Sequence, residues 1–353
     1  IPEEELKKLQ EKRREERKRK KEIPALLWLS KEMAIKSPAM LVEALTEIRS
    51  GTPYKTYFKK KRSGGKRIIH APSEQLKKIQ RKINRNILKF QLKISNVFGF
   101  SGGDINCAIQ PHLQAESMFS VDIKDAFPSI GEYNVFGFFT EGREVLYEGA
   151  GRRPGRWTSV KSTYSKLVKF KPGYMSWYAA RIVTQLVTYQ GRLPQGAPTS
   201  PRLFDLLFKL VDVKLIDFAN NAGANYTRYA DNIFFSINEE KFPGKLKNGI
   251  LRRIRRGGFI PHKMKIEKFD GKAVRMLGLN IVGQKICNTR NFKRRLRKAI
   301  HHVGWMIDRG MRNTAEFETG WDKLQGQMAF ARLDTLPQKL VISYKNLRIR
   351  LAL

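Results

Sequence analysis

Two apolar, β-like stretches of this sequence each carry a carboxylate. Asp122 lies near the end of the run MFSVDI, and Asp231 stands in YADN, just before a second apolar run. Burying a lone carboxylate is costly unless the group is hydrogen-bonded or binds a cation. Either aspartate alone is most simply a turn or cap residue. If the two act together, however, neighbouring strands must deliver both to the same edge of one sheet, which strongly limits the fold.

Two carboxylates at one sheet edge would suit Mg²⁺. This hard cation takes oxygen ligands and is usually held by one or two carboxylates plus substrate phosphates. In phosphoryl transfer, two such ions about 3.5–4 Å apart stabilise the attacking and leaving oxygens together. The pair Asp122 and Asp231 therefore predicts a site for two Mg²⁺ ions, with Mn²⁺ as a candidate substitute.

The charge balance predicts a polyanionic partner. Lys and Arg number 69 against 32 Asp and Glu, which gives a formal net charge of +37. Such an excess disfavours the compact state unless a polyanion offsets it, and a nucleic acid gains affinity as neutralised phosphates release counterions. An anionic membrane is the competing interpretation, but the basic residues are spread along the whole chain rather than gathered on one amphipathic helix. We therefore expect a nucleic-acid partner and no membrane.

Cysteine use and hydropathy exclude other classes of protein. Cys107 and Cys287 are far apart and lack metal-ligand spacing, which predicts a reducing, cytoplasmic setting without a zinc site. No apolar run approaches the roughly 20 residues that cross a bilayer. A hydrophobic fraction of 41% fits a folded protein and excludes general disorder.

The hydrophobic patterns predict a mixed α+β chain. A charged arm and two short helices open it, and a basic hairpin is expected around Ser63-Gly64-Gly65. A helix that Ser200 caps and Pro201 begins is expected to be buried. Further elements are a helix over residues 76–90, strands at 118–123 and 276–283, a hairpin at 226–236, and helices from about 290 onward. Residues 143–173 are Gly-rich, basic and weakly periodic, and we interpret them as an inserted segment.

Several further stretches occur in a fixed order around the two aspartates. They read SGGKRIIHAPSEQLKKIQRKI, VFGFSGGDINCAIQPH, FSVDIKDAFPSI, LPQGAPTSP, YTRYADNIFFS and MLGLNIVG. Together they resemble the fingers and palm blocks of reverse transcriptases, most closely the bacterial group that includes retron, group II intron-like and defence-associated enzymes. QGAPTSP followed by YAD plus one residue is a highly specific signal. The resemblance covers roughly residues 50–305.

The resemblance implies a right-hand polymerase with an antiparallel palm sheet, α/β fingers and a helical thumb. Residues 1–49 would form a basic N-terminal arm with short helices. Residues 50–284 would form fingers and palm, with the basic insert at about 143–173. Residues 285–353 would form a helical, basic thumb, since NFKRRLRKAIHH resembles the start of that domain.

The resemblance also implies a role for each matched residue at the reaction centre. Asp122 and Asp231 look like the catalytic, metal-binding carboxylates, and the backbone carbonyl of Ile123 is a further candidate ligand. Phe127 looks like the aromatic gate beneath the incoming sugar. An aromatic ring there would clash with a 2′-OH, so deoxynucleotides are the expected substrates. Without the family match, Phe127 would be read as a core residue.

Other matched residues are expected to bind the incoming nucleotide. Gln195 and Gly196 look like the floor under the nucleotide and template base, where glycine permits close approach. Lys66 and Arg67 look like fingers contacts to the triphosphate, for which arginine offers a planar fork. Solvated hairpin charges explain this pair equally well. Lys265 occupies the place of a palm lysine usually found near the triphosphate.

Primer and template contacts are expected from Tyr229 and from two basic segments. A half-buried strand tyrosine is the alternative for Tyr229, and a solvated loop is the alternative for the first segment. The segments contribute Arg152, Arg153 and Arg156 from the insert, and Arg294, Arg295, Arg297 and Lys298 from the thumb. Trp305 and Trp321 are expected in the core. Surface or nucleic-acid-contact positions are expected for His70, His112, His301 and His302.

Asn232 departs from the family pattern, which usually has two adjacent aspartates at this turn. The amide carbonyl can still serve the site with weaker metal affinity, so Asn232 remains an expected catalytic residue. Alternatively, the loss of charge slows or specialises the enzyme, or the chain is a degenerate polymerase retained as a nucleic-acid binder. We favour an active enzyme. A chain released from catalysis has no physical reason to keep two carboxylates that repel each other without a metal.

The expected function is RNA-directed DNA synthesis in the bacterial cytoplasm. The chain would copy a structured non-coding RNA with dNTPs and would bind the nascent DNA and the RNA–DNA duplex. A protein effector or a second copy of the chain is a candidate partner. Two alternatives stay open: template-independent or protein-primed DNA synthesis in an antiviral defence system, and a catalytically inert scaffold that binds nucleic acid.

Overall fold

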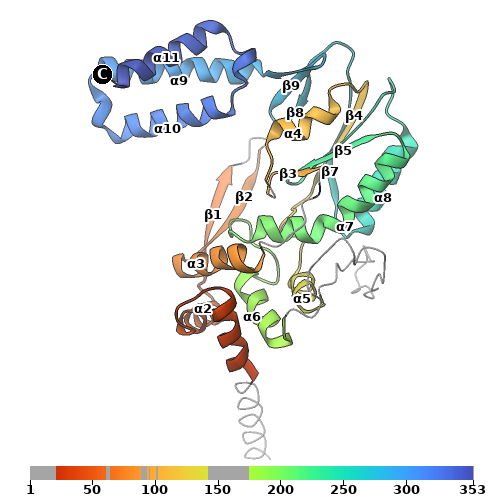
Figure 1. Ribbon diagram of the computed structural model, residues 1–353, viewed down its shortest axis with the longest axis vertical. Coiled ribbons are helices and arrows are strands. Elements are labelled where there is room, and N and C mark those ends of the chain that lie inside the picture. The colour runs from red at the N-terminus through yellow and green to blue at the C-terminus, as the bar shows by residue number, and fades with distance from the viewer. Residues whose placement is uncertain are drawn as a thin grey trace, which may run out of the picture. The chain divides into compact units, whose positions relative to one another are not determined.

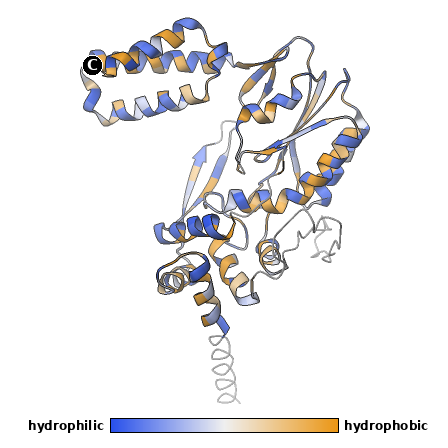
Figure 2. Cartoon of the chain, in the orientation of Figure 1, coloured by the Kyte–Doolittle hydropathy of each residue, from blue (hydrophilic) through white to orange (hydrophobic). Residues whose placement is uncertain are grey.

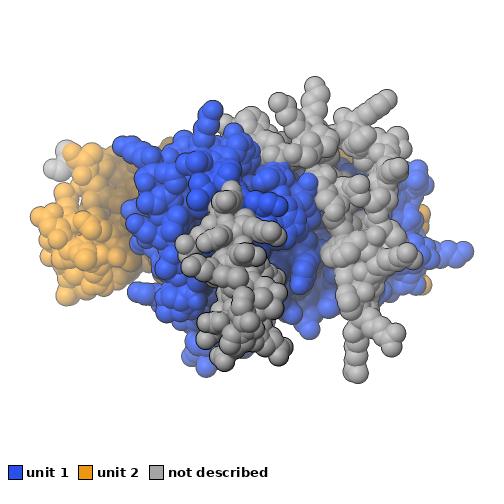
Figure 3. Space-filling model, turned by 90° about the horizontal axis from the view of Figure 1, so that it is seen from below, with its two compact units in different colours: residues 1–103, 120–234, 243–265 blue, residues 104–119, 235–242, 266–353 orange. Residues whose placement is uncertain are grey.

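The protein is described by a computed structural model over residues 21–60, 64–88, 94, 96–100, 102–141 and 175–352. These residues form a mixed α+β structure (Figure 1), as the sequence predicts. The chain divides into two compact units, which Figure 3 colours separately. Unit 1 comprises residues 1–103, 120–234 and 243–265, and unit 2 comprises residues 104–119, 235–242 and 266–353. The basic segment predicted at 143–173, with Arg152, Arg153 and Arg156, lies outside the described residues.

The largest sheet has five strands in the order β3-β5-β6-β4-β7. In this order across the sheet, the strands are β3 Val97–Phe98, β5 Asn225–Tyr229, β6 Asn232–Ile237, β4 Ser117–Ile123 and β7 Pro261–Lys268. Strands β4 and β6 run antiparallel, since the N–H of Glu116 bonds the carbonyl of Ile237 at one end and the N–H of Ile123 bonds that of Asp231 at the other. The short edge strand β3 pairs with β5 in parallel, which the sequence did not predict.

Helices α7 (Ser200–Asn221) and α8 (Gly244–Arg256) pack together in unit 1. Figure 2 shows hydrophobic and hydrophilic stretches alternating along both. α7 is buried along much of its length, as predicted, but its N-cap is Thr199 rather than Ser200. The hydroxyl of Ser200 instead donates to the carbonyl of Pro194 at 2.7 Å and ties the helix start to the preceding loop.

The remaining elements of unit 1 begin with a helix over residues 21–32 and α2 (Ala39–Arg49). The predicted basic hairpin is confirmed: β1 and β2 pair antiparallel from Tyr54↔Pro72 to Lys60↔Lys66. The helix predicted after it changes from α to π geometry, where the N–H of Leu88 bonds the carbonyl of Ile83. The bounds are β1 Tyr54–Lys60, β2 Lys66–Pro72, α3 Glu74–Lys82, the π-helix Ile83–Ile87, α5 Glu132–Glu141 and α6 Trp177–Val187.

In unit 2, the strand predicted over residues 276–283 is in fact a hairpin. Leu277 and Gly278 have φ values of +51° and +87°, so the chain reverses there. Two consecutive left-handed residues make a tight hairpin turn, which glycine favours. The sheet order is β10-β9-β8, with bounds Lys285–Asn288, Leu279–Val282 and Val274–Met276. The first residues of the predicted helical thumb, 285–288, are therefore a strand.

Three helices complete unit 2 and share one hydrophobic core. They are α9 (Arg290–Asp308), α10 (Ala315–Phe330) and α11 (Gln338–Ala352). On α9, Phe292, Leu296, Ile300 and Val303 form the buried stripe. The unit also contains α4 (Ile105–Ile109) and a short 3₁₀ helix, Gln110–His112. Among the helices that the structure describes, none is long and apolar enough to cross a membrane.

Candidate active site

Asp231 lies in the two-residue turn between β5 and β6. Its partner in the turn, Ala230, has a φ of +56°, which non-glycine residues rarely adopt. Two hydrogen bonds hold Ala230 in place: its N–H donates to the carbonyl of Phe98 at 3.1 Å, and its carbonyl accepts from Nη1 of Arg228 at 2.7 Å. The backbone that presents Asp231 is thus fixed by its surroundings.

Asp122 lies on the strand next to this turn. The N–H of Ile123 donates to the carbonyl of Asp231 at 3.0 Å. Because side chains alternate along a strand, Val121 and Ile123 are buried while Asp122 is half-buried on the opposite face. The structure therefore places the two predicted carboxylates at the same end of the sheet, Asp122 on β4 and Asp231 in the turn that leads into the neighbouring strand β6.

The electrostatics of Asp122 agree with this proximity. Burial, and then the neighbouring Asp231, raise the pKa of Asp122 above its ordinary value. Lys263 and His262, at the start of β7, oppose that shift and lower the pKa. The lowering by Lys263 identifies this residue as a cation near Asp122. Sequence reasoning had assigned only Lys265 to this region.

Asn232 is the first residue of β6, and its amide is turned toward Asp231. Its Nδ2 donates to Oδ1 of Asp231 at 3.2 Å. An aspartate at this position would replace that donor with a second carboxylate, which would repel Asp231. The asparagine thus stabilises the conformation of its neighbour in a way that the usual pair of aspartates cannot.

Arg228, which sequence reasoning passed over, is the largest fully buried side chain near these residues. Its guanidinium donates to Asp212 through Nε at 2.7 Å and through Nη2 at 2.8 Å, and to Asp205 through Nη1 at 2.8 Å. It lies over the ring of Phe208 at 5.0 Å. Burial opposes the charge of Arg228, but Asp212 and then Asp205 more than offset it, so its pKa is raised. Since Nη1 also bonds Ala230, this ion cluster anchors the turn that carries Asp231.

Phe127 and Gln195 lie in loops of unit 1. The ring of Phe127 is half-buried and lies 5.6 Å from Phe100 and 6.0 Å from Phe204, centroid to centroid. The carbonyl of Gln195 accepts a hydrogen bond of 2.7 Å from the N–H of His70 on β2. This bond ties the loop after α6 to the hairpin β1–β2.

Gly196 is required where this loop meets the hairpin. Its φ is +127°, and a Cβ there would lie 2.7 Å from the carbonyl oxygen of His70 and 2.9 Å from Cγ2 of Ile69. Both obstacles belong to β2, so any side chain would push the hairpin away. The predicted role of glycine in allowing close approach therefore has a structural counterpart, although the approaching group here is protein backbone.

The predicted basic contacts of unit 1 are exposed. Lys66 and Arg67 lie at the start of β2, and Nζ of Lys66 is 5.8 Å from the ring centre of Phe58. Lys265 is also exposed, on β7, whereas Tyr229 is half-buried at the end of β5. All four positions are compatible with the expected contacts.

The basic residues predicted for the thumb lie on the outer face of α9. Arg294, Arg295, Arg297 and Lys298 are all exposed there. Trp321 packs on the core of unit 2, as predicted. Trp305 differs: it is 39% exposed, stacks on His302 with ring centres 6.0 Å apart, and carries Arg309 over its face. The prediction of a core position for Trp305 was wrong, because the indole lies beside the buried stripe of α9 rather than in it.

His112 also differs from the surface position predicted for it. It is completely buried, and its Nδ1 lies 2.7 Å from Oγ of Ser236. Burial lowers the pKa of His112 to about 3. His70 is half-buried and lies 3.1 Å from Oγ1 of Thr56, whereas His301 and His302 are exposed, as predicted. Within the described part of the chain, no three His, Cys, Asp or Glu residues gather as a metal-binding group.

Comparison with known proteins identifies the relatives of this chain. No protein-family model matches it. It is 28% identical to the retron Ec86 reverse transcriptase of Escherichia coli over 255 residues, which cover 71% of this chain and 70% of that enzyme. It is 26% identical to the retron Ec73 reverse transcriptase of the same species, over 81% of this chain and 84% of that enzyme. Over most of its length, the chain is therefore similar to retron reverse transcriptases.

Other matches extend the comparison. The retron Mx65 reverse transcriptase of Myxococcus xanthus is 29% identical over 70% of this chain and 55% of that enzyme. Among solved structures, telomerase from Candida albicans in complex with a fragment of telomeric RNA matches 70% of this chain and 50% of that one, at 10% identity and a TM-score of 0.42. A foamy viral protease-reverse transcriptase in complex with an RNA/DNA hybrid matches 72% of this chain and 26% of that one, at 14% identity and a TM-score of 0.36.

Proposed function

We propose that this retron reverse transcriptase homologue copies a structured RNA into DNA at Asp122 and Asp231. The hydrogen bond between the N–H of Ile123 and the carbonyl of Asp231 is the observation that carries the proposal. It supports a shared site because it joins the two strands at the residues where the carboxylates lie. In this proposal the residues act in the cytoplasm of a bacterium, with a protein effector or a second copy of the chain as a candidate partner.

The donor set of this site fits divalent cations. Repulsion from Asp231 contributes to the raised pKa of Asp122, so a cation bound at both carboxylates would be stabilised there, and Mg²⁺ prefers such oxygen ligands. We propose that Asp122, Asp231 and the carbonyl of Ile123 hold two Mg²⁺ ions, or Mn²⁺ in their place. When bound, the ions would stabilise the attacking and leaving oxygens of nucleotidyl transfer. Asn232 would orient Asp231 through the bond from its Nδ2.

The other residues would position the substrates. Phe127 would exclude a 2′-OH and so select dNTPs, while Gln195 and Gly196 would support the nucleotide where their loop meets β2. Lys66, Arg67 and Lys265 would bind the triphosphate, and Tyr229 would contact the primer end. This assignment corresponds to a right-hand polymerase with fingers and palm over residues 50–284 and a thumb over residues 285–353.

The thumb and the insert would hold the duplex of template RNA and nascent DNA. Exposed guanidinium and ammonium groups along one helix face suit a phosphate backbone, since each neutralised phosphate releases counterions. On α9 these groups belong to Arg294, Arg295, Arg297 and Lys298. Arg152, Arg153 and Arg156 of the insert are assigned the same task from the sequence.

A primer-extension assay with labelled dNTPs tests the proposal. Wild type is expected to make a product dictated by the RNA template, and Asp231→Ala is expected to make none. A homopolymer made without template, or a product attached to the protein itself, would replace the proposal with template-independent or protein-primed synthesis.

Asn232 favours a second candidate function, that of a nucleic-acid-binding scaffold. This position lacks the second carboxylate of the usual pair, and an inert site would tolerate that loss. The same assay decides between them, because a scaffold would incorporate no more nucleotide than Asp231→Ala under any choice of template or metal.

A further inference from the structure

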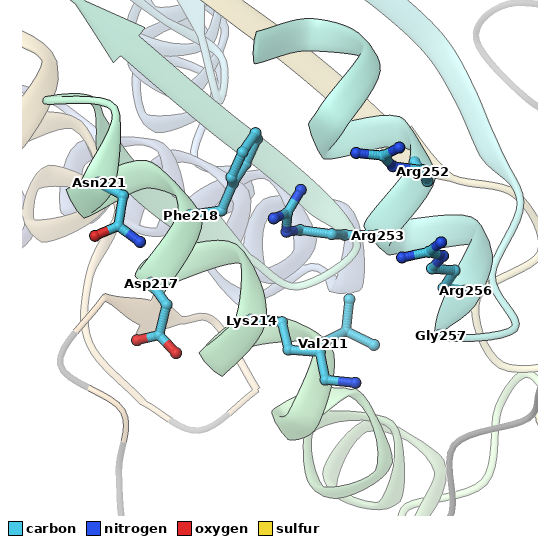
Figure 4. Close-up of a pocket in the computed structure, with 9 residues that line it drawn as sticks. All are labelled: Val211, Lys214, Asp217, Phe218, Asn221, Arg252, Arg253, Arg256 and Gly257. Carbon is cyan, nitrogen blue, oxygen red and sulfur yellow. The ribbon is translucent and has the colours of Figure 1, made fainter. Parts of the chain in front are cut away.

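A basic hollow lies between α7 and α8, apart from the residues assigned to catalysis. Its volume is about 380 Å³. Figure 4 shows its lining, in which residues of α7 face residues of α8. The side chains that matter here are Lys214, Asp217 and Phe218 from α7, and Arg252, Arg253 and Arg256 from α8.

Two glycines of unit 1 let the walls of this hollow approach closely. A Cβ on Gly249 would lie 2.3 Å from Cζ of Phe218, and a Cβ on Gly257 would lie 2.4 Å from Cγ2 of Val211. The ring of Phe218 in turn supports Arg253, whose guanidinium lies 3.5 Å from the ring centre and donates through Nη1 to the carbonyl of Gly249 at 3.2 Å. One guanidinium is therefore held in a fixed orientation, with N–H groups left to bind a ligand.

The hollow concentrates positive charge. Three arginines and Lys214 line it, against one carboxylate, Asp217. Burial, and then repulsion from Arg252 and Arg256, lower the pKa of Arg253. Guanidinium groups that repel one another in a hollow gain stability when an anion enters between them. Their planar forks match phosphate oxygens better than a single ammonium group would.

We propose that this hollow binds the phosphate backbone of an RNA strand at a point separate from the catalytic aspartates. A backbone fits better than a base, because the guanidinium of Arg253 already covers a face of the only aromatic ring in the lining. The net charge of +37 makes a long polyanion the matching partner. Such a site would bind RNA without specificity for its base sequence and would hold part of the RNA outside the reaction centre.

The sequence of α8 supplies a matched control. Arg252, Arg255 and Arg256 are all exposed on the same helix, but Arg255 does not line the hollow. The full chain and three single variants, Arg252→Glu, Arg256→Glu and Arg255→Glu, would be titrated with a fluorescein-labelled RNA hairpin that has a single-stranded tail. Fluorescence anisotropy at several salt concentrations gives the affinity and its salt dependence.

The two hollow variants are expected to bind about fivefold more weakly than Arg255→Glu and to reduce the slope of log K against log salt by about 1. A labelled DNA of the same sequence is expected to show the same difference, since the contact is to phosphate. Equal affinities and slopes for all three variants would overturn the proposal and leave only a diffuse basic surface. Preferential loss of binding to anionic lipid vesicles, with RNA binding unchanged, would also overturn it.

Two further measurements separate this proposal from the proposed function. Thermal unfolding checks that each variant is folded, and Arg252→Gln and Arg256→Gln repeat the test if a charge reversal destabilises the chain. Extension of a short primer–template is expected to be unchanged in the hollow variants. Because RNA binding is measured directly, an inactive wild-type chain would contradict the polymerase proposal and still leave the hollow to be tested.

Discussion

Unit 1 contains two pairs of aspartates that differ in how their charge is balanced. Asp205 and Asp212 are buried, and both accept hydrogen bonds from Arg228. Asp122 and Asp231 are half-buried, and the pKa of Asp122 is raised by burial and then by Asp231, with Lys263 and His262 only partly offsetting the shift. The negative charge of the first pair is offset within the fold by the guanidinium of Arg228. The charge of the second pair is only partly offset by nearby side chains, which is what the proposed metal site would require.

The two pairs are physically linked through Arg228. The same guanidinium that neutralises Asp212 also donates to the carbonyl of Ala230, one residue before Asp231. The buried ion cluster of Arg228 with Asp205 and Asp212 thus helps to hold the turn that carries Asp231. Strain at the left-handed Ala230 is sustained by that support. The difference suggests three experiments that treat the pairs separately, and a fourth that addresses a buried group outside both pairs.

The largest effect is expected at Asp122. Replacing it in Asp122→Asn should lower the single-turnover rate of nucleotide addition by about 10³-fold or more, since metal coordination contributes several kcal/mol to the transition state. The free energy of unfolding should stay the same or rise, because repulsion from Asp231 disappears. Asp125→Asn removes the same charge three residues away and serves as the control. Equal rates for the two variants would show that Asp122 has no special role.

At Arg228 the expected effect is on stability. Arg228→Met should lower the free energy of unfolding by about 3–5 kcal/mol, because it leaves two buried carboxylates without their cation. The triple variant Arg228→Met/Asp205→Asn/Asp212→Asn should regain most of that loss. Urea unfolding measures both. If Arg228→Met lowers the free energy of unfolding by less than about 1 kcal/mol, the cluster contributes no more than an ordinary surface ion pair.

His112 is a third type of buried group, a titratable ring whose Nδ1 lies 2.7 Å from the hydroxyl of Ser236. Its pKa is lowered to about 3 in the folded chain, so protonation favours the unfolded chain, where the ordinary pKa is about 6.5. Stability is therefore complete above about pH 6.5 and falls as the pH drops toward 3. The loss should be about 1.4 kcal/mol per pH unit in that window. His112→Gln should remove this component from the pH dependence of urea unfolding. Parallel curves for the variant and the wild type would contradict the assignment.

The smallest effect is expected at Asn232. Asn232→Asp should keep the fold intact, with the free energy of unfolding slightly lowered because the new carboxylate repels Asp231. It should also lower the Mg²⁺ concentration for half-maximal activity about threefold to tenfold, since a ligand of higher charge binds the cation more tightly. Asn225→Asp, at the exposed start of β5, makes the same substitution away from the site. If both variants titrate with Mg²⁺ as the wild type does, residue 232 takes no part in metal binding.

The sequence predicted the elements whose signals are local. Alternation in MFSVDI and the apolar runs around YADN indicated β4 and the β5–β6 hairpin, and the helices expected from about residue 290 onward correspond to α9, α10 and α11. The family motifs indicated which aspartates to pair. The single strand expected at 276–283 was wrong, because the left-handed turn at Leu277 and Gly278 interrupts an apolar run that is otherwise typical of one strand.

The sequence alone predicted a basic, mixed α+β chain that resembles reverse transcriptases and carries two candidate metal carboxylates. Tertiary structure decided which charges are balanced. Arg228 sits in a strand-like segment with nothing nearby to mark it as buried, and its carboxylate partners lie on α7, 16 and 23 residues earlier. His112 likewise meets Ser236 across 124 residues. Burial and charge pairing depend on residues that are distant in the chain, so only folding brings together the groups that set them.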